Sequence, residues 1–580
     1  MALLPPTVIG PVSVLNSSIR VQGQNIGASV ELFASGISSP IGGGTAVLSN
    51  QVFPLNPGVQ LAPGQTITAT QSMNGETSPA SPAAVTVQSK PSTVGAVGCS
   101  THIYQCGQSL FLFGVVPGAS VQVSVAGSLR GQGISADGTL SINLSEPILA
   151  GETVVVTQLA GGVSGPGLTL QQPDNVPVAA GGQLPPPTLL TPVYACQSAF
   201  QISNVVDGAL VTLTETPGSS SSRLFAGPNG ILDGDPLTAG GTVTVQQTML
   251  TGCQISGTQS APVTVTPTAP VPPPKIGGPI FVGGHHIELT NLIPGAQVEI
   301  FQGSESLGTA TCFGAAQFFA VPALARKKLV QATQQLCGNV SGGSSELKPG
   351  AAPALTRPKV QKSLFQCGST VGVTNLQVGA TVLVYSTALG APIGIAQVTS
   401  ADMDIQVAPL LNAGDQIFAR QQLANEQSKA SKSITVAPLP NQGMPAIVAP
   451  VGVGSSNVFV QNMVIGARAD VYVNNVFRGS ALATAQSVQV NLSAPLLNLG
   501  DVVSVVETTC EGSLTGASIT VAGCQCTQVS KAPTFTKGLF LYTFNCNTPI
   551  GTVETVQLTA TDDISALQQA ELGCDSEYGA

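Results

Sequence analysis

Few residues of this chain can carry catalysis. It has three histidines, His102, His285 and His286, so a Ser-His-Asp or Cys-His site would have to use one of them. None has a counterpart in the repeats described below. The adjacent pair precedes a strand-like stretch, where an alternation of period two would turn the two rings to opposite faces. We therefore predict no catalytic residue and no enzymatic activity.

Metal and cofactor motifs are incomplete. Asp233-Gly234-Asp235 resembles part of a calcium loop, but the other oxygen ligands of such a loop are missing. The glycines at 42–44 lack the Lys-Ser/Thr that a phosphate loop requires. The pair in Cys524-Gln525-Cys526 has no second pair or histidine at zinc-site spacing. The sequence predicts no bound metal and no cofactor.

The twelve cysteines fall into repeated positions. Cys106, Cys196 and Cys367 form a first column, each two residues after Tyr or Phe. Cys253, Cys337 and Cys510 form a second, shortly after a Gln or Glu. Because one repeat holds both columns, we predict a Cys196–Cys253 disulfide. The other expected pairs are Cys99 with Cys106, Cys312 with Cys337, and some pairing among Cys510, Cys524, Cys526, Cys546 and Cys574. An even count at repeated positions favours an oxidising, extracellular setting.

One turn occurs six times along the chain. A glycine, followed by alanine and then alternating apolar and polar residues, recurs every 84 to 91 residues. Period two is typical of a strand with one buried face, and glycine suits the preceding turn because it tolerates positive φ. The glycines of these landmark turns are Gly27, Gly118, Gly208, Gly295, Gly379 and Gly466.

A second landmark confirms the repeat. Four copies have a glycine seven residues before a glutamine, as in Gly240 and Gln247, with β-forming residues between them. Lys327 replaces this glycine in the fourth copy, and Glu507 replaces the glutamine in the sixth. We expect the polar residue to pair with backbone at a sheet edge rather than to bind a ligand.

Length and composition set the architecture. The 580 residues include 66 Gly, 43 Pro and no Trp, yet 43% are hydrophobic and alternate regularly, so packed sheets are expected rather than disorder. Several short strands per unit favour an all-β chain of six immunoglobulin-like β-sandwich modules in tandem, plus a short C-terminal β-rich unit. We place the modules at 6–88, 91–172, 188–267, 275–347, 359–438 and 445–522, and the last unit at 531–580.

The connections and the C-terminal end suggest how the modules are arranged. Proline-rich spacers at 173–187 and 270–274 predict stiff linkers and an elongated rod. Asp562 and Asp563 start a short helix expected at 564–572. The C-terminal unit is either a cap or an incomplete sandwich. In the second case a strand such as 11–15 of a neighbouring molecule would complete it and give head-to-tail polymers.

Charge excludes several classes of partner. Only 8% of residues are charged and the net charge is −9, so the broad positive field of a nucleic-acid binder is missing. No apolar run is long enough for a membrane span. The first residues lack the basic and apolar regions of a signal peptide, so the export route is open.

The modules resemble the bacterial immunoglobulin-like repeats of surface proteins and adhesins. The resemblance rests on Pro-Gly-Ala-x-Val-x-Val (117–123), Leu-x-x-Gly (237–240) and Ser-x-Pro-Val-Thr-Val (260–265), and it covers about 6–522. It implies a non-enzymatic protein of the cell exterior, a rigid stalk or filament subunit, whose partners are itself or cell-surface components. The alternative is an adhesin or carbohydrate-binding array. Sugar sites usually present aromatic platforms, but this chain has no Trp and only six Tyr, which disfavours this alternative.

Overall fold

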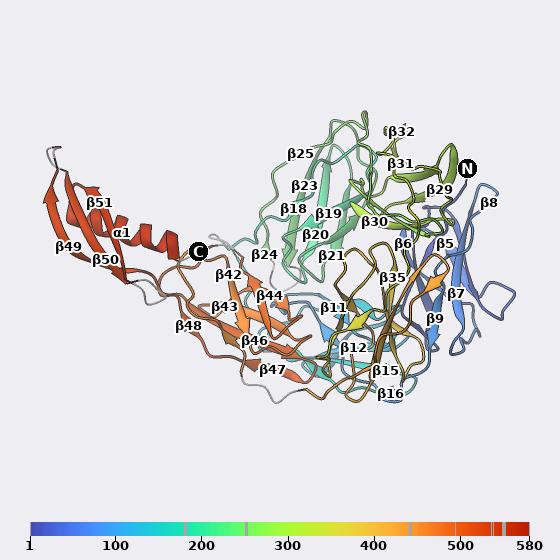
Figure 1. Cartoon of the computed structure of the whole chain (residues 1–580), viewed down its shortest axis with the longest axis horizontal. Coiled ribbons are helices and arrows are strands. Elements are labelled where there is room, and N and C mark those ends of the chain that lie inside the picture. The colour runs from blue at the N-terminus through green and yellow to red at the C-terminus, as the bar shows by residue number, and fades with distance from the viewer. Residues whose placement is uncertain are drawn as a thin grey trace. The chain divides into compact units, whose positions relative to one another are not determined.

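The fold, seen in a computed structural model, is built from small β-sheets (Figure 1). The structure describes residues 2–578 apart from 179–181, 250–252, 254, 440–443, 494, 535, 537–538 and 548–552. Within these residues the one helix is α1 (Asp563–Tyr578). The predicted all-β class, with six immunoglobulin-like sandwiches and a short C-terminal unit, is confirmed. The module boundaries set from the sequence stay a prediction.

Module 3 illustrates how the sequence makes a sandwich. A three-stranded sheet in the order β18 (Thr188–Leu189), β19 (Ala199–Ser203), β22 (Gly230–Asp233) faces a larger sheet in the order β21 (Ser220–Leu224), β20 (Leu210–Thr216), β23 (Thr242–Met249), β24 (Ile255–Ser256). Along β23 every second residue is buried, including Val243, Val245 and Gln247. These residues face Phe200 and Ile202 of β19, which are also fully buried. Alternation therefore places one face of each sheet in a shared core.

The other modules repeat this pair of sheets, with antiparallel pairing except between β2 and β9. Module 1 contains β1 (Thr7–Ile9), β2 (Val12–Ser13), β3 (Ser18–Gln22), β4 (Ser29–Ala34), β5 (Gly42–Thr45), β6 (Asn50–Pro54), β7 (Thr66–Met73), β8 (Glu76–Thr77) and β9 (Val85–Gln88). Module 2 contains β10 (Gly98–Cys99), β11 (Ser109–Phe113), β12 (Ser120–Val125), β13 (Ser128–Ile134), β14 (Thr139–Asn143), β15 (Val154–Ala160), β16 (Val163–Ser164) and β17 (Leu168–Thr169). Module 3 contains β18 (Thr188–Leu189), β19 (Ala199–Ser203), β20 (Leu210–Thr216), β21 (Ser220–Leu224), β22 (Gly230–Asp233), β23 (Thr242–Met249), β24 (Ile255–Ser256) and β25 (Val263–Thr264).

The second half of the array follows the same order. Module 4 contains β26 (Lys275–Ile276), β27 (His286–Thr290), β28 (Gln297–Gln302), β29 (Glu305–Thr311), β30 (Ala316–Ala320), β31 (Val330–Leu336) and β32 (Asn339–Val340). Module 5 contains β33 (Lys359–Val360), β34 (Thr370–Thr374), β35 (Thr381–Ser386), β36 (Pro392–Gln397), β37 (Met403–Gln406), β38 (Gln416–Leu423), β39 (Glu426–Gln427) and β40 (Ile434–Thr435). Module 6 contains β41 (Ala446–Ile447), β42 (Asn457–Gln461), β43 (Arg468–Val473), β44 (Val476–Leu482), β45 (Ser487–Asn491), β46 (Val502–Thr509), β47 (Gly512–Thr515) and β48 (Ile519–Thr520).

The C-terminal unit is a different fold. A three-stranded sheet of β49 (Gln525–Pro533), β50 (Phe540–Asn547) and β51 (Val553–Ala560) is covered on one face by α1 (Figure 1). Asp562 caps the helix, because its Oδ1 accepts the Ser565 amide at 2.8 Å, as expected. The helix continues past 572 to Tyr578, and a disulfide ties its Cys574 to Cys524. A second disulfide joins Cys526 and Cys546.

The expected rod is wrong for the first five modules. The chain divides into two units, Met1–Pro438 and Leu439–Ala580. Within the first unit, module 1 touches module 4, where the Leu4 amide donates to Thr309 O at 3.0 Å. Module 1 also touches module 5, where Gln88 Nε2 donates to Pro392 O at 2.8 Å. Five modules that contact non-neighbours cannot form an extended row.

The proline-rich spacers also behave differently from free linkers. Leu184 and Val271 are buried, and Val271 belongs to the core of module 4. The second spacer, and the first spacer from Leu184 onward, are therefore the first residues of the modules that follow. Asp174 of the first spacer instead pairs with Tyr104 of module 2, and 179–181 lie outside the described residues.

The strand proposed for addition to a neighbouring molecule is already in use. Val12 and Ser13 form β2, which pairs with Val87 and Gln88 of the same module, and both residues are fully buried. The C-terminal unit is closed on one face by its helix rather than left without a strand. Polymerisation by adding 11–15 to that unit is therefore wrong for this fold.

Candidate functional site

The repeated chemistry of this chain lies at the joints between consecutive modules. Each module contributes a four-residue docking turn, in which the amide of the fourth residue donates to the carbonyl of the first at 2.9 to 3.4 Å. In modules 2 to 5, docking turns follow the short first strand. The six docking turns are Ser13–Asn16, Tyr104–Gly107, Tyr194–Gln197, Phe281–Gly284, Phe365–Gly368 and Gly452–Ser455.

The landmark glycines form the other side of the joint. All six have positive φ, between 80° and 91°, as the sequence predicted. A second reason for glycine appears only in the structure, because at Gly118, Gly208, Gly295 and Gly379 the preceding module, in or directly beside its docking turn, lies against the position that a Cβ would take. A Cβ on Gly208 would lie 2.7 Å from Gly107 Cα, and a Cβ on Gly118 would overlap the backbone of Leu15 and Asn16. Any side chain there would push the two modules apart.

Polar contacts fix the first two joints in the same way. Between modules 1 and 2, Ser13 Oγ donates to Pro117 O at 2.7 Å, and Arg20 Nε meets Asp137 Oδ2 at 2.6 Å. Between modules 2 and 3, the His102 amide donates to Asp207 Oδ2 at 2.6 Å. Apolar side chains also reach across, since Tyr194 and Phe281 pack on the cores of modules 4 and 5.

Disulfides lock these joints between modules rather than within them. Cys106 of module 2 bonds Cys253 of module 3, with the two Cα atoms 6.1 Å apart. Cys196 of module 3 bonds Cys337 of module 4 at 5.6 Å. Cys367 and Cys510 are also disulfide-bonded. Each first-column cysteine is the third residue of a docking turn, with φ between 61° and 69°.

The predicted Cys196–Cys253 pair is wrong, and so are Cys99–Cys106 and Cys312–Cys337. The Cys196 amide bonds Leu237 O, just before β23 begins, whereas Cys253 follows the far end of that strand. Eight residues of strand span about 26 Å, and a disulfide needs Cα atoms within about 7 Å. The two columns stand at opposite ends of one module, so they can meet only across a joint.

The other two cysteines of the wrong pairs are buried thiols. Cys99 lies in β10 and is buried in the core of module 2, and Cys312 is buried in the core of module 4. Burial raises the pKa of the Cys312 thiol to about 12, and its Sγ donates to Ile293 O at 2.9 Å. A thiol with so high a pKa is a poor nucleophile, so it serves as a core residue.

The landmark glutamine ties the joint to its own module. Gln71, Gln158, Gln247, Gln334 and Gln421 are at most 1% exposed. In each, Oε1 accepts an amide just before the landmark glycine, and Nε2 donates to a carbonyl of the segment entering the module, all at 2.7 to 2.9 Å. Pairing with backbone was expected, but the residue is buried rather than at a sheet edge.

Glu507 in the sixth module is a natural departure from this pattern. Its Oε1 accepts the Val464 amide at 2.6 Å, and burial raises its pKa above the ordinary 4.5. The folded-state pKa is therefore higher than the unfolded one. This residue stabilises module 6 most in acid, and the contribution falls as pH rises through the interval between the two pKa values.

Glu507→Gln should remove this pH dependence. A neutral amide keeps the acceptor for Val464 without placing a charge in the core, so module 6 should gain on the order of 1 kcal/mol near pH 7. Pulse proteolysis in urea at pH 4 and pH 7 measures this. A gain at pH 4 equal to that at pH 7 would contradict the role assigned to the buried carboxylate.

The joint between modules 4 and 5 has the geometry of a disulfide without the cysteines. Gly283 is the third residue of its docking turn, with φ 75°, and Ala424 stands three residues after the landmark glutamine, as Cys337 does. A Cβ on Gly283 would lie 3.0 Å from Ala424 Cβ. Natural disulfides have a mean Cβ separation of about 3.8 Å, so a small shift suffices.

Gly283→Cys with Ala424→Cys should therefore form a disulfide without an engineered change elsewhere. We expect the oxidised double variant to be more stable than its reduced form by about 2 to 4 kcal/mol. Thiol titration and thermal unfolding with and without reductant measure this, with the two single variants as controls. Thiols that stay reactive in the oxidised double variant would show that the joints are not equivalent.

The histidines take structural positions. His102 is buried at the joint between modules 2 and 3, where its Nε2 lies 2.8 Å from Asp174 Oδ2 and its ring meets the edge of Tyr104. His285 Nδ1 lies 3.3 Å from Val321 O. Burial, and then the neighbouring His285, lower the pKa of His286 to about 4, so its ring is neutral at pH 7.

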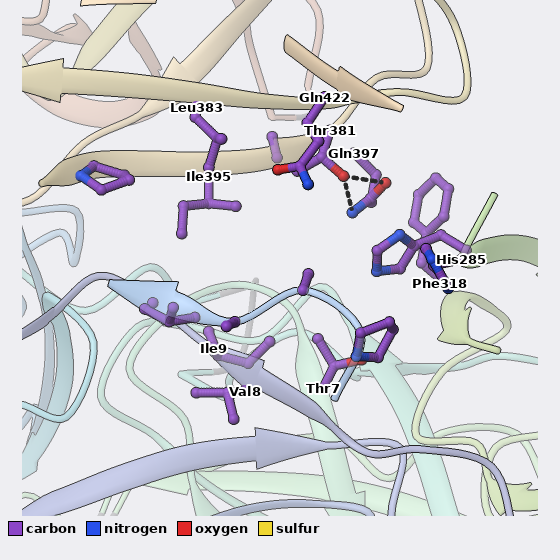
Figure 2. A pocket seen from close by; sticks show the side chains of 18 of the residues that line it. Thr7, Val8, Ile9, His285, Phe318, Thr381, Leu383, Ile395, Gln397 and Gln422 are labelled. Atoms are coloured by element: carbon purple, nitrogen blue, oxygen red, sulfur yellow. Dashed lines mark hydrogen bonds between the residues drawn. The ribbon is translucent and has the colours of Figure 1, made fainter. Parts of the chain in front are cut away.

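Residues of modules 1, 4 and 5 line a partly open cavity of about 660 Å³ (Figure 2). Thr381, Leu383 and Gln422 line one side from module 5, and Figure 2 shows Thr7 and Ile9 of module 1 facing them across the space. Among its described lining residues there is no Asp, Glu, Lys or Arg. The cavity is thus neutral, with amide, hydroxyl and apolar groups.

Both members of the histidine pair are among the residues that line this cavity, and the expectation that their rings face apart stays a prediction. His286 is the first residue of β27 and His285 precedes it, so the alternation of the strand does not extend to both.

No group of three or more His, Cys, Asp or Glu in the described part of the chain is placed to hold a metal. No helix within that same part is long and apolar enough to cross a membrane.

Comparison with known proteins adds little. Two solved structures are similar to parts of the chain. The chicken CNTN1 FN1-FN3 domains are 12% identical, with 43% of this chain and 98% of that one covered and a TM-score of 0.15. The BSP domain of a biofilm associated protein is 10% identical, with 75% and 96% covered and a TM-score of 0.15. At such scores neither likeness carries an argument. No family model and no curated protein matches the chain.

Proposed function

We propose that this chain is a non-enzymatic structural protein of the cell exterior, a filament subunit built from linked immunoglobulin-like modules. The observation that carries the proposal is the pair of disulfides, Cys106–Cys253 and Cys196–Cys337, each joining a module to the next. Bonds of this kind persist in oxidising compartments outside the cytosol. They hold neighbouring modules together even when the contacts of the joint give way.

The rest of the joint is consistent with load bearing. The landmark glycine lets two backbones approach closely, and the buried glutamine fastens the entering segment to the strand next to it. Tension on the chain therefore meets buried hydrogen bonds and covalent links at the same place. Repeat proteins in which each unit supports the next gain stability from such interfaces.

Labelling of intact producing cells tests the location. We expect a membrane-impermeant amine reagent to reach the protein, and we expect Cys106, Cys196, Cys253 and Cys337 to resist alkylation unless a reductant is added first. A cytosolic protein of the same cells, carrying reactive thiols, is the control. Protection from the reagent together with reduced cysteines would remove the extracellular role.

A second candidate function, ligand binding by an adhesin, is favoured by the neutral cavity between modules 1, 4 and 5. Phe318 and His285 lie at its wall, where a neutral sugar ring would find an aromatic face and amide donors (Figure 2). A glycan array with the full-length protein tests this. Binding that Phe318→Ala abolishes, but that the exposed Phe459→Ala keeps, would support it. No binding by the unaltered protein would remove it.

A further inference from the structure

The joint is directional, so the array has two ends that differ. From module 1 to module 5, the docking turn of one module lies at the landmark turn of the next, as Gly107 meets Gly208 and Phe281 meets Gly379. Such a contact is heterologous, because the two surfaces are different. Within the described residues, a Cβ on the landmark glycine of module 1 would come within 4 Å of Met73 alone, and one on Gly454 in the docking turn of module 6 would meet no atom within 4 Å.

The landmark turn of module 1 is open where its counterparts are covered. Ile26 is 44% exposed, whereas Pro117, Asp207 and Pro294 at the same position are buried. Around Gly27 the nearest atom to an added Cβ is the end of Met73, at 3.9 Å. Module 4 touches this turn from one side, through Asn25 Nδ2 and Thr309 O, yet Ile26 and Gly27 stay exposed.

The docking turn of module 6 keeps the geometry of the others. Gly452 forms the same isolated bridge to the end of its module, with Ala522, that Tyr194 forms with Thr266. Gly454, its third residue, is exposed with φ 83°, and a Cβ there would meet no described atom within 4 Å. Gly452 replaces an aromatic residue, but Ser13 shows that a joint forms without one.

We propose that the docking turn of module 6, residues 452–455, binds the landmark turn of module 1 in a second copy of this chain. Molecules then join end to end through a further joint of the kind already repeated between modules 1 to 5 inside each molecule. A heterologous contact that does not close on itself gives a filament. The inference rests on the proposed structural role, and it names the partner surface for it.

The disulfides of the inner joints show where cysteines would cross-link two molecules that meet in the same way. Cysteines occupy the third position of three docking turns, which is Gly454 in module 6. Cys337 stands three residues after its glutamine with φ 50°, and Asn74 of module 1 stands in the same place with φ 52°. If the two ends meet as the inner joints do, cysteines at Gly454 and Asn74 of different molecules will lie within bonding reach.

The test uses the full-length protein with Asn74→Cys and Gly454→Cys, oxidised at high concentration and run on non-reducing gels. We expect the double variant to give a ladder of multimers that a reductant collapses to monomer. An equal mixture of the two single variants should stop at a dimer, since each molecule then has one reactive end. Each single variant alone should give no ladder.

Two controls make the result decisive. Gly454→Cys combined with Gln60→Cys places the second thiol at an exposed site before β7, at the other end of this strand from Asn74, and should give no ladder. Gly283→Cys with Ala424→Cys shows that cysteines at these positions bond when a joint is present. A double variant that stays monomeric while this internal bridge forms would overturn the inference, as would an equal ladder from the Gln60 control. Labelling of intact cells tests the proposed function separately.

Discussion

Stretching single molecules from their termini should give a contour length about 600 Å longer in reductant than without it, from the segment between Cys106 and Cys337 alone. The Cys106–Cys253 disulfide bypasses 147 residues, and the Cys196–Cys337 disulfide bypasses 141. These two loops overlap, so the shortest covalent path from Cys106 to Cys337 runs through both disulfides and the 57 residues between Cys196 and Cys253, and it leaves out 174 of the 231 residues. At about 3.3 to 3.6 Å per extended residue, these 174 residues give the expected gain.

Overlap also makes the two disulfides partly redundant, which gives a sharper expectation. Replacing Cys106 and Cys253 by Ser leaves the other bypass in place, so the path contains the 90 residues from 106 to 196 instead of 57. The unreduced contour length should then increase by only about 110 Å. Replacing all four cysteines should add the full length without reductant. The remaining disulfides are the same in every variant and cancel in the comparison. A gain of about 600 Å from the first pair alone would show that the loops do not interlock.

Gly118→Ala should destabilise the joint between modules 1 and 2 far more than Gly27→Ala destabilises module 1. The two glycines have φ of 80° and 87°, so each alanine costs about 1 to 2 kcal/mol of left-handed strain. Only at Gly118 does the new methyl also meet the backbone of another module, at Leu15 and Asn16. Overpacking against backbone adds about 1 to 3 kcal/mol.

Hydrogen exchange of residues 12–25, together with thermal unfolding of the full chain, measures both variants. We expect Gly118→Ala to lose about 2 to 5 kcal/mol of protection at the joint, where the described residues include no disulfide that would hold the modules together. Gly27→Ala supplies the matched control for strain. Equal effects of the two substitutions would mean that the landmark glycine serves its turn and not the joint.

The sequence was sufficient to predict the modules because their signals are local. A glycine before an alternating stretch, as at Gly208, reports a turn and a strand wherever it occurs. The second role of Gly208, which is to let the preceding module approach closely, could not be predicted, because Gly107 belongs to a segment about a hundred residues away. The spacing from the glycine identified the landmark glutamine. The alternation of the neighbouring residues did not show that this polar side chain is buried.

The cysteine pairs show where repeat logic misleads. The two columns were recognised, and only the partner was wrong, because Cys196 and Cys253 share a module but not an end of it. The tyrosine before Cys106 and Cys196 was a signal that this position meets something apolar. The cavity had no signal at all, since it forms where Thr7, His285 and Thr381 of non-consecutive modules meet.

Mapping the disulfides by mass spectrometry after non-reducing digestion tests the central claim, that neighbouring modules are joined covalently at a repeated joint. We predict one linked peptide pair containing Cys106 and Cys253, and another containing Cys196 and Cys337. A linked pair containing Cys196 and Cys253 would place the bond inside one module and contradict the account.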